Sequence, residues 1–125
     1  MRPTASVLLV EDNYLLLEML TAVCQREGIH VLSASTGEAA LTMLRSRADA
    51  IDWLLTDINL PGLIDGWTVA DAYRHRHPTR PVIYTSTAPH LGQRTVPGSV
   101  YVRKPFQTRE IIALARKIAT HALAA

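Results

Sequence analysis

Short runs of apolar residues alternate along this chain with longer stretches in which apolar residues recur every three or four positions. Unbroken runs are typical of strands buried on both faces of a parallel sheet, and the wider spacing is typical of helices that cover such a sheet. The pattern predicts strands at residues 7–10, 29–34, 52–56, 81–85 and 99–102, and helices at 13–27, 65–77 and 108–123, with another helix opening at 35–38. Strands alternating with helices predict an α/β fold with a parallel sheet.

Residues at the predicted helix ends support these boundaries. Gly28 is a typical stop after the first helix, and Pro78 ends the third. Ser35 and Glu38 have the spacing of a capping box, which predicts a cap for the second helix. One face of the last helix carries the apolar residues Ile111, Leu114, Ala115, Ile118 and Ala122.

Polar residues that can carry chemistry follow directly after four of the predicted strands. The first strand runs into Glu11 and Asp12, and the central strand runs into Asp57. The fourth runs into the hydroxyls at 85–87, and the fifth runs into Lys104. Because ligands of open α/β sheets bind just beyond the carboxyl ends of the strands, we expect acids, a base and hydroxyls to share one edge.

The segment at residues 88–98 departs from the alternation. It contains two prolines and two glycines and few apolar residues at helical spacing, so we expect no regular helix there. Elsewhere, His75 and His77 are two residues apart and point to different sides of a helix, which argues against a metal pair. Trp53 and Trp67 are predicted to be packing residues.

Composition sets bounds on the function. A chain of 125 residues fits one domain, and we expect a single domain over residues 1–125 with its core at about 6–123. The formal charge of +2, from 13 basic and 11 acidic residues, is too balanced to suggest a nucleic-acid surface. Cys24 is the single cysteine, which predicts a core residue and a reducing compartment. We expect neither a signal peptide nor a membrane span, and a cytoplasmic protein.

From Val7 to about Leu123 the chain resembles the receiver domain of two-component response regulators. The resemblance rests on four stretches in the family's order, at residues 10–13, 56–66, 81–86 and 101–106. It implies a flavodoxin-like, doubly wound sheet of five parallel strands in the order 2-1-3-4-5, with the first and third strands adjacent. Receivers usually have one more helix before the fifth strand, and this chain is similar to single-domain receivers whose fourth helix is short or absent. Ile64 is one residue more than the family's loop has, and we expect it to reshape the site's rim without moving Asp57.

The resemblance implies a phosphoacceptor and a metal site. Asp57 is the expected nucleophile for a phosphoryl group. Asp12 and Asp57 are the expected direct ligands of Mg²⁺, together with the main-chain carbonyl of Asn59, while Glu11 is expected to act through water. Clustered carboxylates repel one another, and a hard divalent cation relieves that repulsion. The alternative for Glu11 and Asp12 is that they only stabilise a helix N-terminus.

The resemblance also implies phosphate-binding and switch residues. Lys104 is expected to meet a phosphoryl oxygen and, without phosphate, to pair with the acceptor aspartate. Its bond to Pro105 is expected to be cis. Ser86 is the expected switch hydroxyl, with Thr87 in the small-residue position beside it. Tyr101 matches the aromatic residue that turns inward when the hydroxyl moves, and the alternative is an ordinary strand aromatic.

The expected function is a phosphoacceptor switch that receives its phosphoryl group from a sensor histidine kinase or a histidine phosphotransfer protein. It would catalyse only its own phosphorylation and dephosphorylation, and would signal to a downstream target protein through changed contacts, without binding nucleic acid or membrane. One alternative is a phosphate-independent pseudo-receiver, which the presence of Asp12, Asp57, Ser86 and Lys104 disfavours. Another is a phosphatase of the haloacid-dehalogenase type, which would have a second acid at the position of Asn59 and a cap domain.

Overall fold

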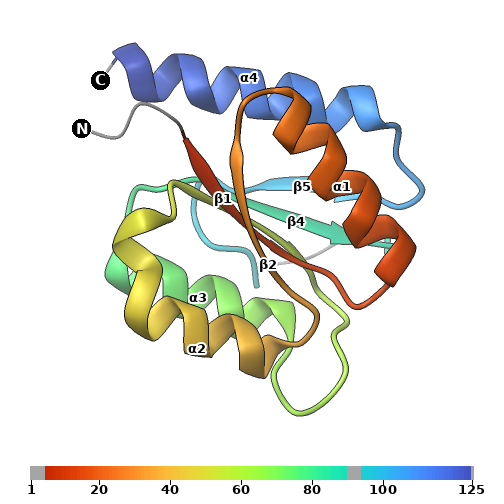
Figure 1. Cartoon of the computed structure of the whole chain (residues 1–125). Helices are drawn as coiled ribbons and strands as arrows, with labels where there is room; N and C mark the ends of the chain where they lie inside the picture. Colours follow the sequence, from red (N-terminus) through yellow and green to blue (C-terminus); the bar gives the residue numbers. More distant parts are fainter. Residues whose placement is uncertain (1–4, 90–93, 125) are drawn as a thin grey trace.

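A parallel sheet of five strands, in the order β2-β1-β3-β4-β5, forms the centre of the molecule (Figure 1). The computed structural model describes residues 5–89 and 94–124. The strands are β1 (Ser6–Val10), β2 (His30–Ala34), β3 (Trp53–Asp57), β4 (Val82–Ser86) and β5 (Val100–Arg103). The strand order confirms the predicted flavodoxin-like arrangement, with β1 beside β3.

Helices cover both faces of the sheet (Figure 1). One face is covered by α1 (Tyr14–Arg26) and α4 (Thr108–Ala124). The other is covered by α2 (Gly37–Arg47) and α3 (Gly66–Arg76), and a short 3-10 helix (Ala48–Ala50) follows α2. Each helix lies within a few residues of its predicted range.

The strands alternate between the two cores, one residue to each face. Leu54 lies between Leu8 and Val82 in the register of β1, β3 and β4, and all three pack toward α2 and α3. The next residues along, Leu9, Leu55 and Ile83, pack toward α1 and α4. Full burial of one such side chain contributes about 1.5–3 kcal/mol. The unbroken apolar runs therefore reflect a sheet that is buried on both sides.

The start of α2 differs from the prediction. The cap is Thr36, whose hydroxyl accepts a hydrogen bond from the Ala39 N–H at 3.0 Å. The predicted capping box of Ser35 and Glu38 is therefore wrong. Because the helix begins one residue later, Glu38 is too close to the cap to reach back to it, and its carboxylate instead accepts the Leu63 N–H at 3.1 Å.

Between β4 and β5 the described residues, 87–89 and 94–99, contain no helix, as predicted for this part of the segment. Residues 90–93 of that prediction lie outside the described residues. The far end of the segment packs onto β4 and α3: Val96 is buried, and its N–H donates to the Tyr84 hydroxyl at 3.0 Å. Arg74 of α3 donates to the Pro97 carbonyl at 2.7 Å. These contacts place the far end of the segment on the same face of the sheet as α3.

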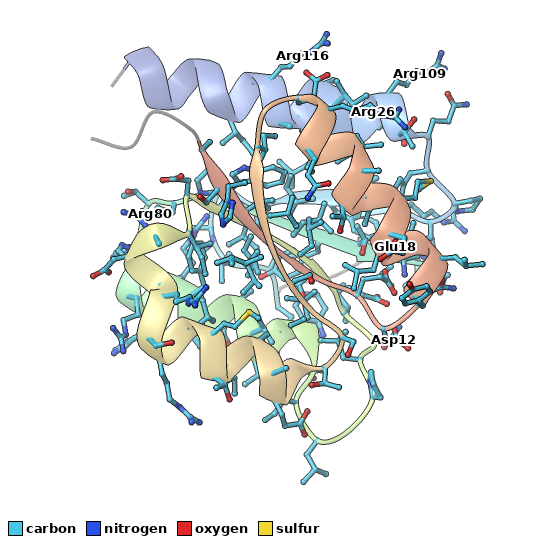
Figure 2. All side chains as sticks on the ribbon, viewed as in Figure 1. Asp12, Glu18, Arg26, Arg80, Arg109 and Arg116 are labelled. Carbon is cyan, nitrogen blue, oxygen red and sulfur yellow. The ribbon has the colours of Figure 1, made fainter. Side chains whose placement is uncertain are left out.

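The two ends of the sheet differ in chemistry, and Figure 2 shows Arg80 and Asp12 at opposite ends. At the end where β4 begins, Arg80 donates to the carbonyls of Asp49 (3.1 Å) and Ile51 (2.8 Å). His77 contacts the Asp49 carboxylate at 2.9 Å. These contacts join the 3-10 helix and the residue after it to the end of α3 and the start of β4, and the acids of the predicted site lie at the other end.

The remaining predicted core residues lie inside the fold. Cys24 and Trp53 are fully buried, and the Trp67 ring lies 5.1 Å from that of Tyr84, centroid to centroid. Ile111 and Ala115 of α4 are buried as predicted, whereas the Ala122 side chain lies outside the described ones. In the described part of the chain, no helix has the length and apolar character needed to cross a membrane.

Candidate functional site

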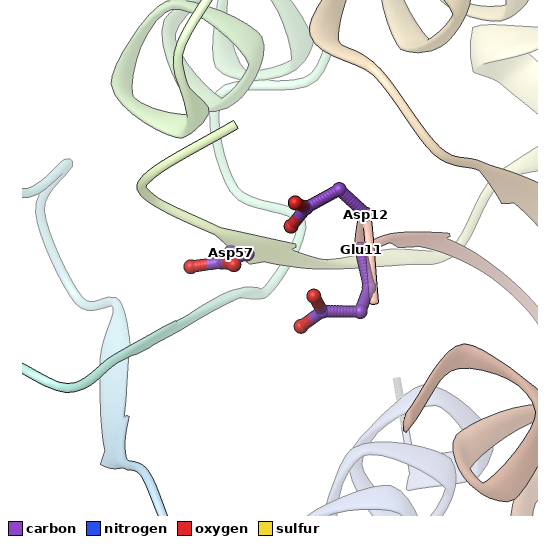
Figure 3. Close-up of side chains that lie close together, drawn as sticks. All are labelled: Glu11, Asp12 and Asp57. Atoms are coloured by element: carbon purple, nitrogen blue, oxygen red, sulfur yellow. The ribbon is translucent and has the colours of Figure 1, made fainter. Parts of the chain in front are cut away.

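Three carboxylates meet where β1 and β3 end (Figure 3). Asp57 is the last residue of β3, and Glu11 and Asp12 directly follow β1. Because Val10 is paired with Thr56 in the register of these neighbouring strands, the residues that follow emerge side by side. One oxygen from each of the three carboxylates lies within 4.8 Å of the others. The structure thus brings together the three acids that the sequence predicted at this edge.

The acids differ in their exposure. Glu11 and Asp57 are 1% and 6% exposed, whereas Asp12 is open to solvent. The main chain orients the two buried carboxylates: Glu11 Oε2 accepts the Asn13 N–H at 3.0 Å, and Asp57 Oδ1 accepts the Asn59 N–H at 3.3 Å. Burial raises the pKa of Glu11, and the nearby charge of Asp57 adds to the increase, while hydrogen bonds from Lys104 and the Asn13 N–H oppose it.

Lys104 lies between the two buried acids. Its ammonium Nζ donates to Glu11 Oε1 at 2.8 Å and to Asp57 Oδ2 at 3.0 Å. Burial alone would lower the pKa of Lys104, but the hydrogen bonds with Glu11 and Asp57 outweigh it, so the pKa is raised and the side chain keeps its charge. The contact with Asp57 agrees with the sequence prediction, and the contact with Glu11 was not predicted.

The backbone around Lys104 fixes its approach to the acids. The Lys104 N–H donates to the Ser86 carbonyl at 2.7 Å, which joins the end of β5 to the end of β4. The bond between Lys104 and Pro105 is cis, as expected. Lys104 thus directly follows β5, which lies beside β4 and its hydroxyls.

The predicted switch hydroxyl lies at the same edge of the sheet. Ser86 is the last residue of β4 and is 1% exposed, and its Oγ accepts the Ala88 N–H at 3.1 Å. Thr85 is buried within the strand, as predicted, and Thr87 is exposed just beyond it. The Tyr101 ring packs inward, and its hydroxyl donates to the Ser86 carbonyl at 3.2 Å. The switch roles of these residues stay predictions.

The charges of the cluster indicate what it can bind. Three carboxylates face one ammonium, so when all are ionised two negative charges remain unbalanced. A hard divalent cation suits such a group, because Mg²⁺ prefers a few carboxylate oxygens completed by water and phosphate oxygens. The site therefore has carboxylate oxygens that can bind a metal cation. It also has the ammonium of Lys104 beside Asp57.

Sequence reasoning missed one residue at the rim of this site. Glu38 was interpreted as part of a helix cap, whereas its carboxylate contacts the loop between β3 and α3. This loop, residues 58–65, includes Asn59 and Ile64, and Ile64 is half-buried against the core beside α2 and α3. The sequence shows an acid near the start of a helix, but the partner of that acid, Leu63, lies 25 residues away.

Comparison with protein families gives one match along most of the chain. Residues 7–116 match the model described as the response regulator receiver domain. The transcriptional regulatory protein CpxR of Escherichia coli K12 is 33% identical over 115 residues, which cover 90% of this chain and 48% of CpxR. The response regulator protein FleR of Pseudomonas aeruginosa is 34% identical over 124 residues, covering 95% of this chain and 25% of FleR. The chain thus spans half or less of the length of these curated relatives.

Solved structures show the same similarity. The response regulator receiver protein from Sinorhizobium medicae WSM419 matches with a TM-score of 0.84 at 30% identity, over 93% of this chain and 94% of that one. The match therefore extends over almost the whole of both chains.

Proposed function

The chain belongs to the response regulator receiver domain family, and we propose that it is a phosphoacceptor switch whose acceptor is Asp57. A receiver domain is a signalling module of two-component systems and not a classical enzyme. The proposal treats residues 1–125 as one receiver domain with its core at about 6–123. Its phosphodonor would be a sensor histidine kinase or a histidine phosphotransfer protein, and a downstream target protein would read the changed surface.

One observation carries the proposal: the Lys104 ammonium bridges Glu11 and Asp57 inside a cluster of acids at the strand ends. A buried carboxylate with an ammonium on one oxygen is held in a fixed orientation. Phosphoryl transfer depends mainly on such positioning and on neutralising charge. The same ammonium can bind a phosphoryl oxygen once Asp57 is modified.

In the transfer step, an oxygen of the Asp57 carboxylate forms a bond to phosphorus while the bond from phosphorus to the donor breaks. The donor leaves with the electron pair of that bond. When the donor is a phosphohistidine protonated on its other ring nitrogen, the leaving group is a neutral imidazole. Lys104 balances the charge of the transferred oxygens, and the Ser86 hydroxyl can donate to one of them while it still accepts the Ala88 N–H.

The donor set fits Mg²⁺. Asp12, Asp57 and the main-chain carbonyl of Asn59 are the proposed direct ligands, and Glu11 is proposed to act through water. Glu11 and Asp57 share the Lys104 ammonium, and each also accepts one main-chain N–H. When bound, the ion neutralises charge on the transferred phosphoryl group.

The test is labelling with acetyl phosphate and Mg²⁺, measured by intact mass. We expect one phosphoryl group on the wild type and on Asp49→Asn, a matched change at an aspartate whose side chain is 89% exposed. We expect none on Asp57→Asn, because this variant lacks the nucleophile. Labelling that persists in Asp57→Asn would exclude the assignment, and sustained hydrolysis of p-nitrophenyl phosphate would favour a phosphatase instead.

A further inference from the structure

The loop at residues 58–65 is fixed at both of its ends. At the β3 end, the Asn59 N–H donates to Asp57 Oδ1 at 3.3 Å. At the α3 end, the Gly66 N–H donates to the Ile58 carbonyl at 2.9 Å, and Asp65 caps the helix by accepting the Thr68 N–H at 3.0 Å. The middle of the loop extends away from the sheet (Figure 1), and Leu63 is 95% exposed.

The middle of the loop is held by the first turn of α2. Glu38 Oε2 accepts the Leu63 N–H at 3.1 Å. The carboxylate also lies directly against Gly62: a Cβ at that position would be 2.7 Å from Oε2 and 2.9 Å from Oε1. Gly62 has a φ of +87°, which other residues rarely adopt. The Glu38 carboxylate therefore contacts two consecutive residues of the loop, Gly62 and Leu63.

A second contact lies next to the first. A Cβ on Gly37 would overlap the carbonyl oxygen and the side chain of Ile64. The start of α2 and the loop therefore touch backbone to backbone at Gly37 while Glu38 binds the neighbouring N–H. Ile64 lies against Gly37 of α2, and its side chain packs onto the core. Gly37 and Glu38 of α2 thus contact three consecutive residues of the loop, 62–64.

We propose that Glu38 is a positioning residue that holds this loop so that the Asn59 main chain stays beside the acidic cluster. This inference rests on the proposed cation site, because the main-chain carbonyl of Asn59 is a proposed ligand of the cation. Asn59 lies between two fixed points, the Asp57 carboxylate and the Glu38 contact at Leu63. Loss of the hydrogen bond between Glu38 and the Leu63 N–H would let the Asn59 carbonyl rotate away from the acidic cluster. The role proposed for Glu38 acts only through the loop.

The test compares Glu38→Ala with Glu38→Gln. The amide oxygen of glutamine can still accept the Leu63 N–H, whereas alanine offers no acceptor. Two quantities are measured: amide hydrogen exchange at Leu63 without metal, and the Mg²⁺ dissociation constant from tryptophan fluorescence. For Glu38→Ala we expect exchange about fivefold faster and Mg²⁺ affinity about fivefold weaker, and for Glu38→Gln values within about twofold of the wild type. Glu18→Ala removes the same charge from an exposed site on α1 and serves as the control (Figure 2).

The outcomes are distinct. Equal losses in Glu38→Ala and Glu38→Gln would show an effect of charge and overturn the positioning role. Faster exchange in Glu38→Ala with unchanged Mg²⁺ affinity would also overturn it, because the loop would then be ordered without serving the cation. A wild type that binds no Mg²⁺ would overturn the cation site and the inference together. A wild type that binds Mg²⁺ but is not labelled by acetyl phosphate would overturn only the phosphoacceptor function.

Discussion

Two connecting segments leave the same edge of the sheet, and they are held in different ways. The loop at 58–65 is tied along its length, by Asp57 at its start, Glu38 in its middle and the Asp65 cap at its end. The segment at 87–99 is tied near its start through Ser86, and its other described contacts with the rest of the fold lie in its second half, at Arg94, Val96 and Pro97.

The difference indicates how each segment should respond to metal binding and to phosphorylation. A preorganised loop loses little conformational entropy when it binds an ion, so the loop at 58–65 is suited to present a ligand to a metal. A segment with prolines, glycines and no described helix has little regular structure to resist a shift of Ser86. We therefore expect Mg²⁺ to act on the first segment and phosphorylation to act on the second.

The largest effect is expected from removal of the metal. In Asp12→Ala, labelling by acetyl phosphate should fall by about a hundredfold or more, because a proposed direct ligand of the cation is lost. The fold should survive, since the Asp12 side chain is exposed. Intact mass measures labelling, and tryptophan fluorescence measures Mg²⁺ binding. A variant that still labels, with an unchanged Mg²⁺ titration, would contradict both the ligand assignment and the contrast between the segments.

The next effect separates the two segments directly. Hydrogen exchange is measured with Mg²⁺ alone and with Mg²⁺ plus beryllofluoride, which imitates a phosphoryl group on an aspartate. We expect beryllofluoride to change exchange at residues 94–99 by about tenfold, and to add little at 58–65 once Mg²⁺ is bound. Reversal of a two-state equilibrium from 1:99 to 99:1 needs about 5.5 kcal/mol, and the contacts of Ser86 and Lys104 with the phosphoryl group are the proposed source. A change at α1 with none at 94–99 would show that the switch lies elsewhere.

The smallest effect concerns one tie of the segment at 87–99. Tyr84→Phe removes the buried hydroxyl that accepts the Val96 N–H, and should lower the free energy of unfolding by about 1–2 kcal/mol. Urea denaturation measures this change. Tyr14→Phe, at a tyrosine that is 71% exposed, is the matched control and should change stability by less than about 0.5 kcal/mol.

The same variant can be checked for local or global opening through Cys24. Burial raises the pKa of the Cys24 thiol to about 11, and the thiol is fully buried, so it should react slowly with thiol reagents near neutral pH. In Tyr84→Phe we expect amide exchange at Val96 to become faster, and the rate of Cys24 modification to change much less. Equal acceleration of both would mean that the hydroxyl supports the whole fold and not this segment in particular.

The sequence alone predicted the elements because their signals are local. An apolar run such as 7–10 is buried on both faces wherever the sheet forms, and the acids that follow it must emerge at the strand's carboxyl end. The prolines and glycines of 88–98 also act locally, so the missing helix was predictable for the described residues. The neighbourhood of Asp57 with Glu11 and Asp12 came from the resemblance, and the register of β1 and β3 bears it out.

Only the tertiary structure decided which donors meet which acceptors. Lys104 binds Glu11 across 93 residues of sequence, and Glu38 binds the Leu63 N–H instead of the start of its own helix. Each is a choice among several partners of similar chemistry, and a shift of one residue in a helix start, as at Thr36, changes the outcome. Hydrogen bonds require their atoms within a few tenths of an ångström, and that accuracy arises from the packing of distant segments and not from the local pattern of residues.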